Sequence, residues 1–267
     1  MINYTRCLIL AEKYGVDPAV IENDYLVEMI LAAIAHDDVL KEIFIFRGGT
    51  CLHKVYFENY RFSEDIDFTF GSSTGVDNAG KEMLRVLEKL KSKNPEILGW
   101  TTKREPERMQ FFVQYAIVRE IGNPKKELKL DICEAPETPA NTNRTLRFLH
   151  DEFKNEKLTI NTNDIEAIAA DKISRTISAN KEARDIYDLK YLLSEDIETG
   201  KMNVEFRKVH SHDIDPVDLI HKINDINLKK TWETRLSHQI KDLPEYDSFI
   251  RQLARLIKEK YKDSFQE

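Results

Sequence analysis

Alternation between hydrophobic and polar residues predicts three β-strands in the first 135 residues of the chain. These strands cover Asp65–Phe70, Met109–Ile117 and Leu128–Cys133. A shorter apolar run, Ile43–Phe46, predicts a fourth strand, and the two glycines that follow it end the run. The strands are scattered among segments of a different pattern, so the sheet they form is expected to be mixed with helices.

Helical periodicity accounts for most of the remaining chain. The pattern predicts helices at residues 4–14, Pro18–Ala35, Thr50–Phe57 and Lys81–Leu90. From Asp164 onward the helical pattern continues to the end of the sequence. The expected fold class is therefore α+β, a mixed sheet flanked by helices and followed by a C-terminal helical bundle. A softer break in the pattern places the domain boundary between residues 198 and 199, which gives domains of 1–198 and 199–267.

Composition narrows the classes of function. The 267 residues carry a net charge of -7 and have a pI of about 5.6, which argues against a generic nucleic-acid coat protein. The three cysteines lie far apart and form neither a disulfide framework nor a zinc motif. The longest apolar run, Met29–Ala35, is far too short to cross a bilayer, and no signal peptide is evident. We expect a cytoplasmic protein with no membrane partner.

The first candidate for chemistry is the glycine turn after the apolar strand. A strand that ends in Gly48-Gly49 and enters a helix presents unpaired backbone N–H groups, and phosphate oxygens bind such groups. Thr50 adds a hydroxyl at the same point. A glycine pair at a turn is more often purely structural, so this motif alone does not decide between a nucleotide site and a simple turn.

Paired carboxylates are the stronger signal. Asp65 and Asp67 lie two apart on a predicted strand, so both point to the same side. Two such charges repel each other unless a cation lies between them, and Mg²⁺ takes a few carboxylates together with phosphate oxygens. Asp131, on another predicted strand, is a candidate third metal ligand or a general base for an attacking hydroxyl. The alternatives are an acidic edge strand and an exposed Asp131.

The helical part offers a second group of candidates. Lys172 lies off the apolar stripe of its helix and is a candidate to hold a triphosphate. Asp185 and Asp188 share one face of the next helix, where acidic residues also serve as partners of the helix dipole. Nearer the paired carboxylates, Arg61 is a candidate phosphate ligand or a structural ion pair, and Ser63 a nucleotide contact or a turn cap.

Five stretches of the chain together resemble one protein family. Arg47–Lys54 (RGGTCLHK) and Arg61–Phe68 (RFSEDIDF) are similar to the first two motifs of AbiEii/AbiGii toxins, also called the MenT group. Ala170–Lys172 (ADK) resembles the third motif, Arg184–Leu189 (RDIYDL) the fourth, and Ile21–Tyr25 (IENDY) a further stretch common in the family. The resemblance covers about residues 15–195, and the motifs occur in the expected order.

The resemblance implies a DNA polymerase β-like nucleotidyltransferase fold and Mg²⁺- or Mn²⁺-dependent transfer of a nucleoside monophosphate from an NTP, with release of pyrophosphate. It also implies a toxin of a toxin–antitoxin or abortive-infection system, an RNA acceptor such as the tRNA 3′ end, and a cognate antitoxin as partner. Carried over by position, the family's roles fall on the following residues: Gly48, Gly49 and Thr50 for phosphate; Asp65 and Asp67 for metal; Lys172 for the nucleotide; and Asp188 near the site.

Two further hypotheses remain open at this point. The acceptor could be a protein or a small molecule, which the low basicity of the chain favours, or the chain could be a non-catalytic module that binds an antitoxin. The gap between Gly49 and Asp65 is longer than in many polymerase β-like enzymes, and no motif marks Asp131 as the third carboxylate. Thr50 stands where serine is common, and its hydroxyl can do the same job.

Overall fold

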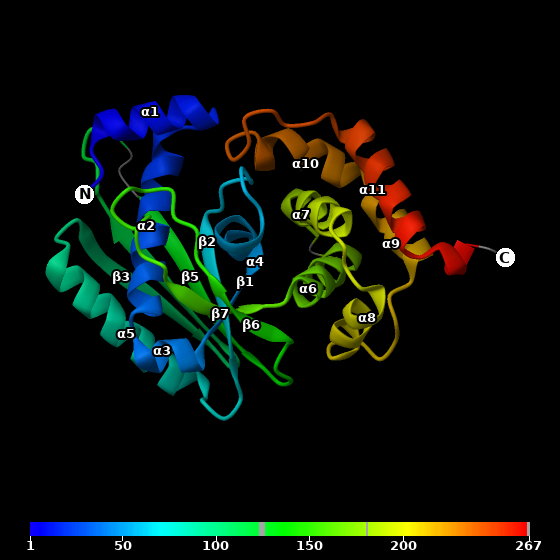
Figure 1. Cartoon of the computed structure of the whole chain (residues 1–267), viewed down its shortest axis with the longest axis horizontal. Helices are drawn as coiled ribbons and strands as arrows, with labels where there is room; N and C mark the ends of the chain where they lie inside the picture. Colours follow the sequence, from blue (N-terminus) through cyan, green and yellow to red (C-terminus); the bar gives the residue numbers. More distant parts are fainter. Residues whose placement is uncertain (123–125, 180, 266–267) are drawn as a thin grey trace. The chain divides into compact units, whose positions relative to one another are not determined.

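The structure is a computed structural model that describes residues 1–122, 126–179 and 181–265 (Figure 1). The chain divides into two compact units, Met1–Thr162 and Asn163–Glu267. The first unit contains the sheet and the helices that cover it, and the described elements that follow the sheet in the second unit are helices. None of the helices in the described ranges combines the length and the hydropathy that a membrane span requires.

A mixed sheet of seven strands forms the centre of the first unit, in the order β3-β4-β5-β2-β1-β7-β6. The central pair β2 and β5 is parallel, as is β1 with β7, whereas β1–β2, β3–β4 and β4–β5 are antiparallel. The strands are β1 (Ile45–Arg47), β2 (Asp65–Gly71), β3 (Ile97–Glu105), β4 (Arg108–Tyr115), β5 (Glu127–Ala135), β6 (Asn141–Thr145) and β7 (Thr159–Asn163).

The helices of this unit pack against the sheet or against one another. They are α1 (Tyr4–Tyr14), α2 (Pro18–Ala35), α3 (Asp38–Ile43), α4 (Gly48–Cys51), the π-helical turn η1 (Leu52–Tyr56) and α5 (Val76–Lys93). Asp17 caps α2 by accepting the backbone N–H of Ala19, and Pro18 stands at its first position. Phe44, which follows α3, contacts both Phe68 and Phe70 of β2. The apolar side of β2 therefore faces Phe44, and Asp65 and Asp67 lie on the opposite side of the strand.

The second unit is built from α6 (Ile165–Ile177), α7 (Ala183–Ser194), α8 (Thr199–Arg207), α9 (Pro216–Ile223), α10 (Ile226–Leu236), α11 (Tyr246–Lys260) and the 3₁₀ turn η2 (Lys262–Phe265). Its core includes Tyr187 stacked on Phe249, with ring centroids 5.5 Å apart, and the buried Trp232 beside them. The boundary expected at residue 198 falls inside this unit, between α7 and α8, and α6 packs against both of these helices.

Candidate active site

A glycine turn joins β1 to α4 and lies directly against the acidic side of β2. Gly48 has a φ of 79°, a conformation that side chains rarely adopt, and a Cβ atom there would lie 2.5 Å from Asp67 Oδ2. A Cβ atom at Gly49 would overlap the Arg61 guanidinium and lie 3.3 Å from Ser63 Oγ. Glycine is therefore required at Gly48, where the positive φ disfavours any side chain, whereas a side chain at Gly49 would have to displace the buried Arg61 guanidinium.

The two acids that the sequence pairs do share one face of β2. Asp65 and Asp67 are partly exposed, while the intervening Ile66 is fully buried. The Thr50 hydroxyl donates to the Asp65 carbonyl oxygen, which ties α4 to the start of β2. This bond uses the hydroxyl proton, so the oxygen of Thr50 is left to act as an acceptor only. The structure thus brings the glycine turn and both acids together, as expected.

Asp131 lies next to this pair and is already neutralised by cations. Parallel pairing of β2 with β5 sets Asp131 beside Asp67, and its side chain is 1% exposed. Arg108 of β4 binds the carboxylate through both Nε, at 2.6 Å, and Nη2. Gln110 donates to it at 3.1 Å, and the Lys129 ammonium lies 3.4 Å away.

The charge state of Asp131 follows from these partners. Burial works to raise the pKa of this carboxyl, but the hydrogen bonds from Arg108 and Gln110 outweigh burial and hold the pKa below its ordinary value. The carboxylate is ionised and its oxygens are occupied by donors. Lys129 also lies 3.9 Å from Asp65, so this face carries cations that touch two of the three acids. No motif in the sequence indicates Arg108 as a site residue.

Beneath the glycine turn lies a buried ionic cluster that sequence reasoning missed. Lys54, the last residue of the RGGTCLHK stretch, places its ammonium 2.8 Å from Asp24 Oδ2 and 2.7 Å from Glu28 Oε1. Glu28 also accepts the backbone N–H groups of Leu149 and His150. Burial disfavours the charged form of Lys54, but the two carboxylates outweigh burial and raise its pKa.

Asp24, Glu28 and His150 bring ligand atoms within 4.8 Å of one another, which is close enough for a metal ion. The Lys54 ammonium, however, already contacts both carboxylates and supplies the positive charge that they require. Burial opposes ionisation of Asp24, but the Lys54 ammonium and the nearby His150 ring hold its pKa below the usual range. We therefore interpret the cluster as a structural ion network. Two motifs of the sequence contain members of this cluster, because Asp24 lies in IENDY and Lys54 ends RGGTCLHK. An ion pair between the two motifs was the signal that could have identified the cluster.

The candidates of the second unit form a cluster of their own. The Lys172 ammonium lies 2.8 Å from Asp185 Oδ1 and 2.9 Å from Asp188 Oδ2, and all three side chains are buried. Arg175 also binds Asp185, at 3.0 Å. Burial works to raise the pKa of Asp185, but Lys172 and Arg175 outweigh it and hold the pKa low. The third and fourth motifs therefore meet in the second unit, whereas the glycine turn and the acids of β2 and β5 belong to the first.

A mixed sheet with a glycine turn set against two strand carboxylates is the arrangement of a nucleotidyltransferase. Comparison with known proteins agrees with this class. The family model described as "Nucleotidyl transferase AbiEii toxin, Type IV TA system" matches residues 30–265. The chain belongs to this family and is a nucleotidyl transfer enzyme of the toxin–antitoxin class. The search of curated proteins gives no match.

Two solved structures share the fold. MenT4, a nucleotidyltransferase toxin from Mycobacterium tuberculosis H37Rv, superimposes with a TM-score of 0.60 at 16% identity, covering 93% of this chain and 87% of that one. A structure titled as a putative nucleotidyltransferase from H. pylori has a TM-score of 0.56 at 18% identity, covering 92% of this chain and 96% of the other. The α+β class predicted from the sequence, with its mixed sheet flanked by helices, is confirmed.

Proposed function

We propose that this enzyme transfers a nucleoside monophosphate from an NTP to the 3′ end of an RNA, most simply tRNA, and that it does so with Mg²⁺ as a toxin in a toxin–antitoxin or abortive-infection system. The observation that carries the proposal is the approach of Asp67 to Gly48, which puts a carboxylate pair and a phosphate-type backbone turn at one point of the sheet. Phosphoryl transfer needs positioning and neutralisation of charge more than it needs a covalent nucleophile.

The donor set supports a hard divalent cation. Asp65 and Asp67 offer carboxylate oxygens from one face of β2, are partly exposed and lie beside a turn that leaves no room for side chains. Oxygen ligands of this kind, combined with substrate phosphates, suit Mg²⁺ and also Mn²⁺. Such an ion, when bound, neutralises the charge that develops on the phosphate during transfer. Asp131 is the third carboxylate of this face, and its bond to Arg108 assigns it the additional task of holding that guanidinium.

Other residues of the chain orient the nucleotide in this proposal. The backbone N–H groups of Gly48 and Gly49 bind phosphate oxygens, and the Arg61 guanidinium packed against Gly49 adds positive charge there. Ser63 lies on the same side of Gly49 and is a further candidate nucleotide contact. In the second unit, Lys172 remains the candidate nucleotide ligand that the third motif indicates, and its ammonium is held in place by Asp185 and Asp188.

The acceptor is tested with labelled substrates. The enzyme is incubated with each of the four labelled NTPs, Mg²⁺ and total tRNA, and label in RNA is measured. Asp65→Asn is expected to reduce incorporation at least a hundredfold, whereas Asp77→Asn, a substitution on the exposed face of α5, leaves it unchanged. Absence of label in RNA with every NTP would refute the RNA acceptor, and equal activity of the two variants would refute the role of Asp65.

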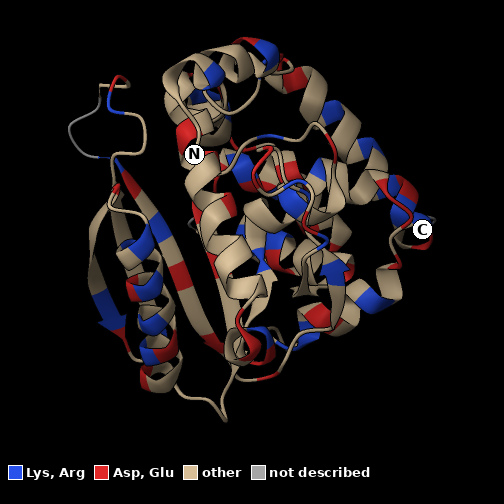
Figure 2. Cartoon of the chain, turned by 60° about the vertical axis from the view of Figure 1, so that its left-hand side comes forward, with Lys and Arg blue, Asp and Glu red and all other residues tan. Residues whose placement is uncertain are grey.

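A protein or small-molecule acceptor is the second candidate, and the charge of the chain favours it. Figure 2 shows acidic and basic residues interspersed along the ribbon, and the net charge of the chain is -7. Label that appears on protein or on a small molecule, with none on RNA, would establish this alternative. In either case the substrates are cytoplasmic, and a cognate antitoxin is the expected protein partner.

A further inference from the structure

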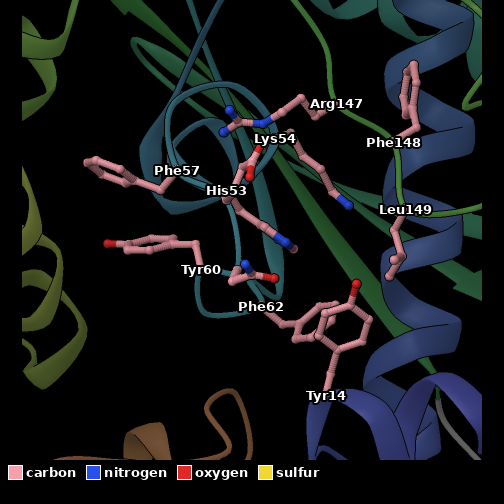
Figure 3. A pocket seen from close by; sticks show the side chains of 11 residues that line it. Tyr14, His53, Lys54, Phe57, Tyr60, Phe62, Arg147, Phe148 and Leu149 are labelled. Carbon is pink, nitrogen blue, oxygen red and sulfur yellow. The ribbon is translucent and has the colours of Figure 1, made fainter.

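A pocket of about 190 Å³ lies in the first unit beside the segment that joins η1 to β2. In Figure 3, Arg147 and Lys54 lie at one end of this pocket, Tyr14 and Phe62 lie at the other, and His53 lies between the two ends. These residues come from α1, η1 and the segments before β2 and after β6. Nothing in the nucleotidyl transfer site described above uses the pocket.

The walls of the pocket are rich in aromatic rings. Tyr14 and Phe62 meet edge to face with centroids 5.6 Å apart, and Phe62 meets the His53 ring in the same way at 5.1 Å. Phe57 and Tyr60 form a second pair, 5.1 Å apart, in the same lining. Rings of this kind provide flat apolar surfaces on which a planar ligand can stack.

Two buried polar atoms of the lining lack partners among the described residues. They are Nη2 of Arg147 and Nδ1 of His53. A guanidinium donates hydrogen bonds in its own plane, so an acceptor in that plane would satisfy Arg147. Burial lowers the pKa of His53 to about 3 and also lowers the pKa of Arg147. The imidazole is therefore neutral and able to accept as well as donate. The pocket suits a flat ligand that has acceptors and donors on its edge.

The pocket adjoins the glycine turn. The side chains of Arg61 and Ser63 approach Gly49, whereas the ring of Phe62, between them in sequence, packs against His53 in the pocket. His53 follows Gly49 by four residues, which is about one helical turn. A ligand in this pocket is therefore separated from the turn by the short segment 61–63.

We propose that the pocket binds a nucleobase, which stacks on the aromatic lining and accepts a hydrogen bond from Arg147. The base is carried either by the nucleotide substrate or by the RNA acceptor, and this part of the proposal rests on the proposed function. A nucleobase combines the two properties that the lining demands, a planar face and an edge of acceptors and donors.

Photo-crosslinking of the full-length protein tests the proposal directly. One arm uses 4-thiouridine triphosphate and 6-thioguanosine triphosphate, and the other uses an RNA whose last nucleotides carry the same thio bases. Irradiation at long wavelength followed by mass spectrometry identifies the labelled peptides. We expect label within residues 53–62 or 147–149. If the thio-nucleotides label these peptides, the base belongs to the nucleotide substrate; if the thio-labelled RNA does, the base belongs to the acceptor.

Matched variants complete the experiment. Arg147→Gln is expected to lower the crosslinking yield at these peptides about tenfold, the size of effect that loss of one base contact produces. Arg119→Gln, at an exposed position of the same unit, leaves the yield unchanged. Phe62→Leu keeps the apolar volume but removes the ring face, and it serves if Arg147→Gln does not fold. Crosslinks only elsewhere, none in either arm, or equal yields for pocket and control variants would overturn the proposal.

The two proposals can fail separately. Pocket crosslinks in a protein that transfers no nucleotide to RNA would leave the base site standing and remove the RNA-directed function. Nucleotide transfer to RNA that depends on Asp65, without crosslinks in the pocket, would support the proposed function and refute the base site.

Discussion

Replacing Lys54 by methionine removes the only ammonium that contacts both Asp24 and Glu28 among the described residues. Both carboxylates are at most 3% exposed, so water cannot replace the lost charge. Breaking a buried ion pair by removing one partner costs about 3–5 kcal/mol. A domain of ordinary stability has about 5–15 kcal/mol in total. Lys54→Met should therefore remain folded at low temperature, but with a much lower midpoint of urea unfolding.

Asp24 and Glu28 differ in the polar partners that they keep when Lys54 is replaced. Glu28 keeps the backbone N–H groups of Leu149 and His150, whereas Asp24 keeps only the His150 ring, whose Nε2 lies 3.3 Å away, and more distant groups. Asp24→Asn combined with Lys54→Met should therefore restore more of the lost stability than Glu28→Gln combined with Lys54→Met. Lys89→Met, at an exposed position of α5, is the matched control.

The pH dependence of the free energy of unfolding gives a second measurement of how Lys54 stabilises the cluster. In the wild type the pKa of Asp24 is lowered, so its contribution to stability is present above the ordinary Asp pKa and is lost as the pH falls through the lowered value. Without Lys54, burial dominates and the pKa of Asp24 rises. The difference in the free energy of unfolding between the wild type and Lys54→Met should then become smaller as the pH falls from 7 towards 4.

Urea unfolding at several pH values measures both effects. Lys54→Met could instead lower the free energy of unfolding by less than about 1 kcal/mol at pH 7, with a difference from the wild type that does not change with pH. That result would refute the view that Lys54 neutralises the charge of this cluster. Destabilisation of the wild type by a chelator would show that a metal ion contributes to the cluster instead.

Three further predictions concern the turn, the acid face and a thiol. Gly48→Ala should abolish nucleotide incorporation, because its Cβ would lie 2.5 Å from Asp67 Oδ2; incorporation is compared with that of Gly122→Ala. Arg108→Gln should destabilise the fold by about 1–3 kcal/mol at pH 7, because Asp131 is left buried without its guanidinium. The pKa of Asp131 is lowered in the wild type and is expected to be higher without Arg108. The loss of stability, measured by urea unfolding, should therefore shrink as falling pH protonates Asp131, first in the variant and only below the ordinary Asp pKa in the wild type. Cys7, whose pKa burial raises to about 11, should react with a thiol reagent at pH 8 only after unfolding, and fast labelling of the native protein would contradict its burial.

The elements with strong periodicity were the ones that could be predicted. The helix at Pro18–Ala35 has the predicted bounds, and the alternation at Asp65–Phe70 identified both the strand and the face that its acids share. Strand β3 was missed because its residues from Thr101 to Arg104 are exposed and polar, so no alternation marks them. The apolar run Ile43–Phe46 was predicted as a strand, but α3 includes Ile43 and β1 begins only at Ile45.

The partners of the site residues could not be predicted, because they depend on register and packing. Asp131 was a candidate from its strand position alone, yet the binding of Arg108 to it follows from the pairing of β4 with β5, which sets their residues opposite one another. The Lys54–Asp24 contact joins residues 30 positions apart. A pattern along the chain indicates which side of a strand a residue occupies but does not identify the residue on the neighbouring strand or helix.

The parallel pairing of β2 with β5 has a consequence for a toxin while it is being synthesised. The strand that carries Asp65 and Asp67 is complete at Gly71, but its partner ends only at Ala135. Parallel neighbours require a long crossover, so no local hairpin can substitute for the missing strand. A ribosome that has released the chain only as far as Gly71 has therefore delivered two of the seven strands, β1 and β2. The acids of β2 therefore gain their parallel neighbour only after nearly the whole first unit has left the exit tunnel.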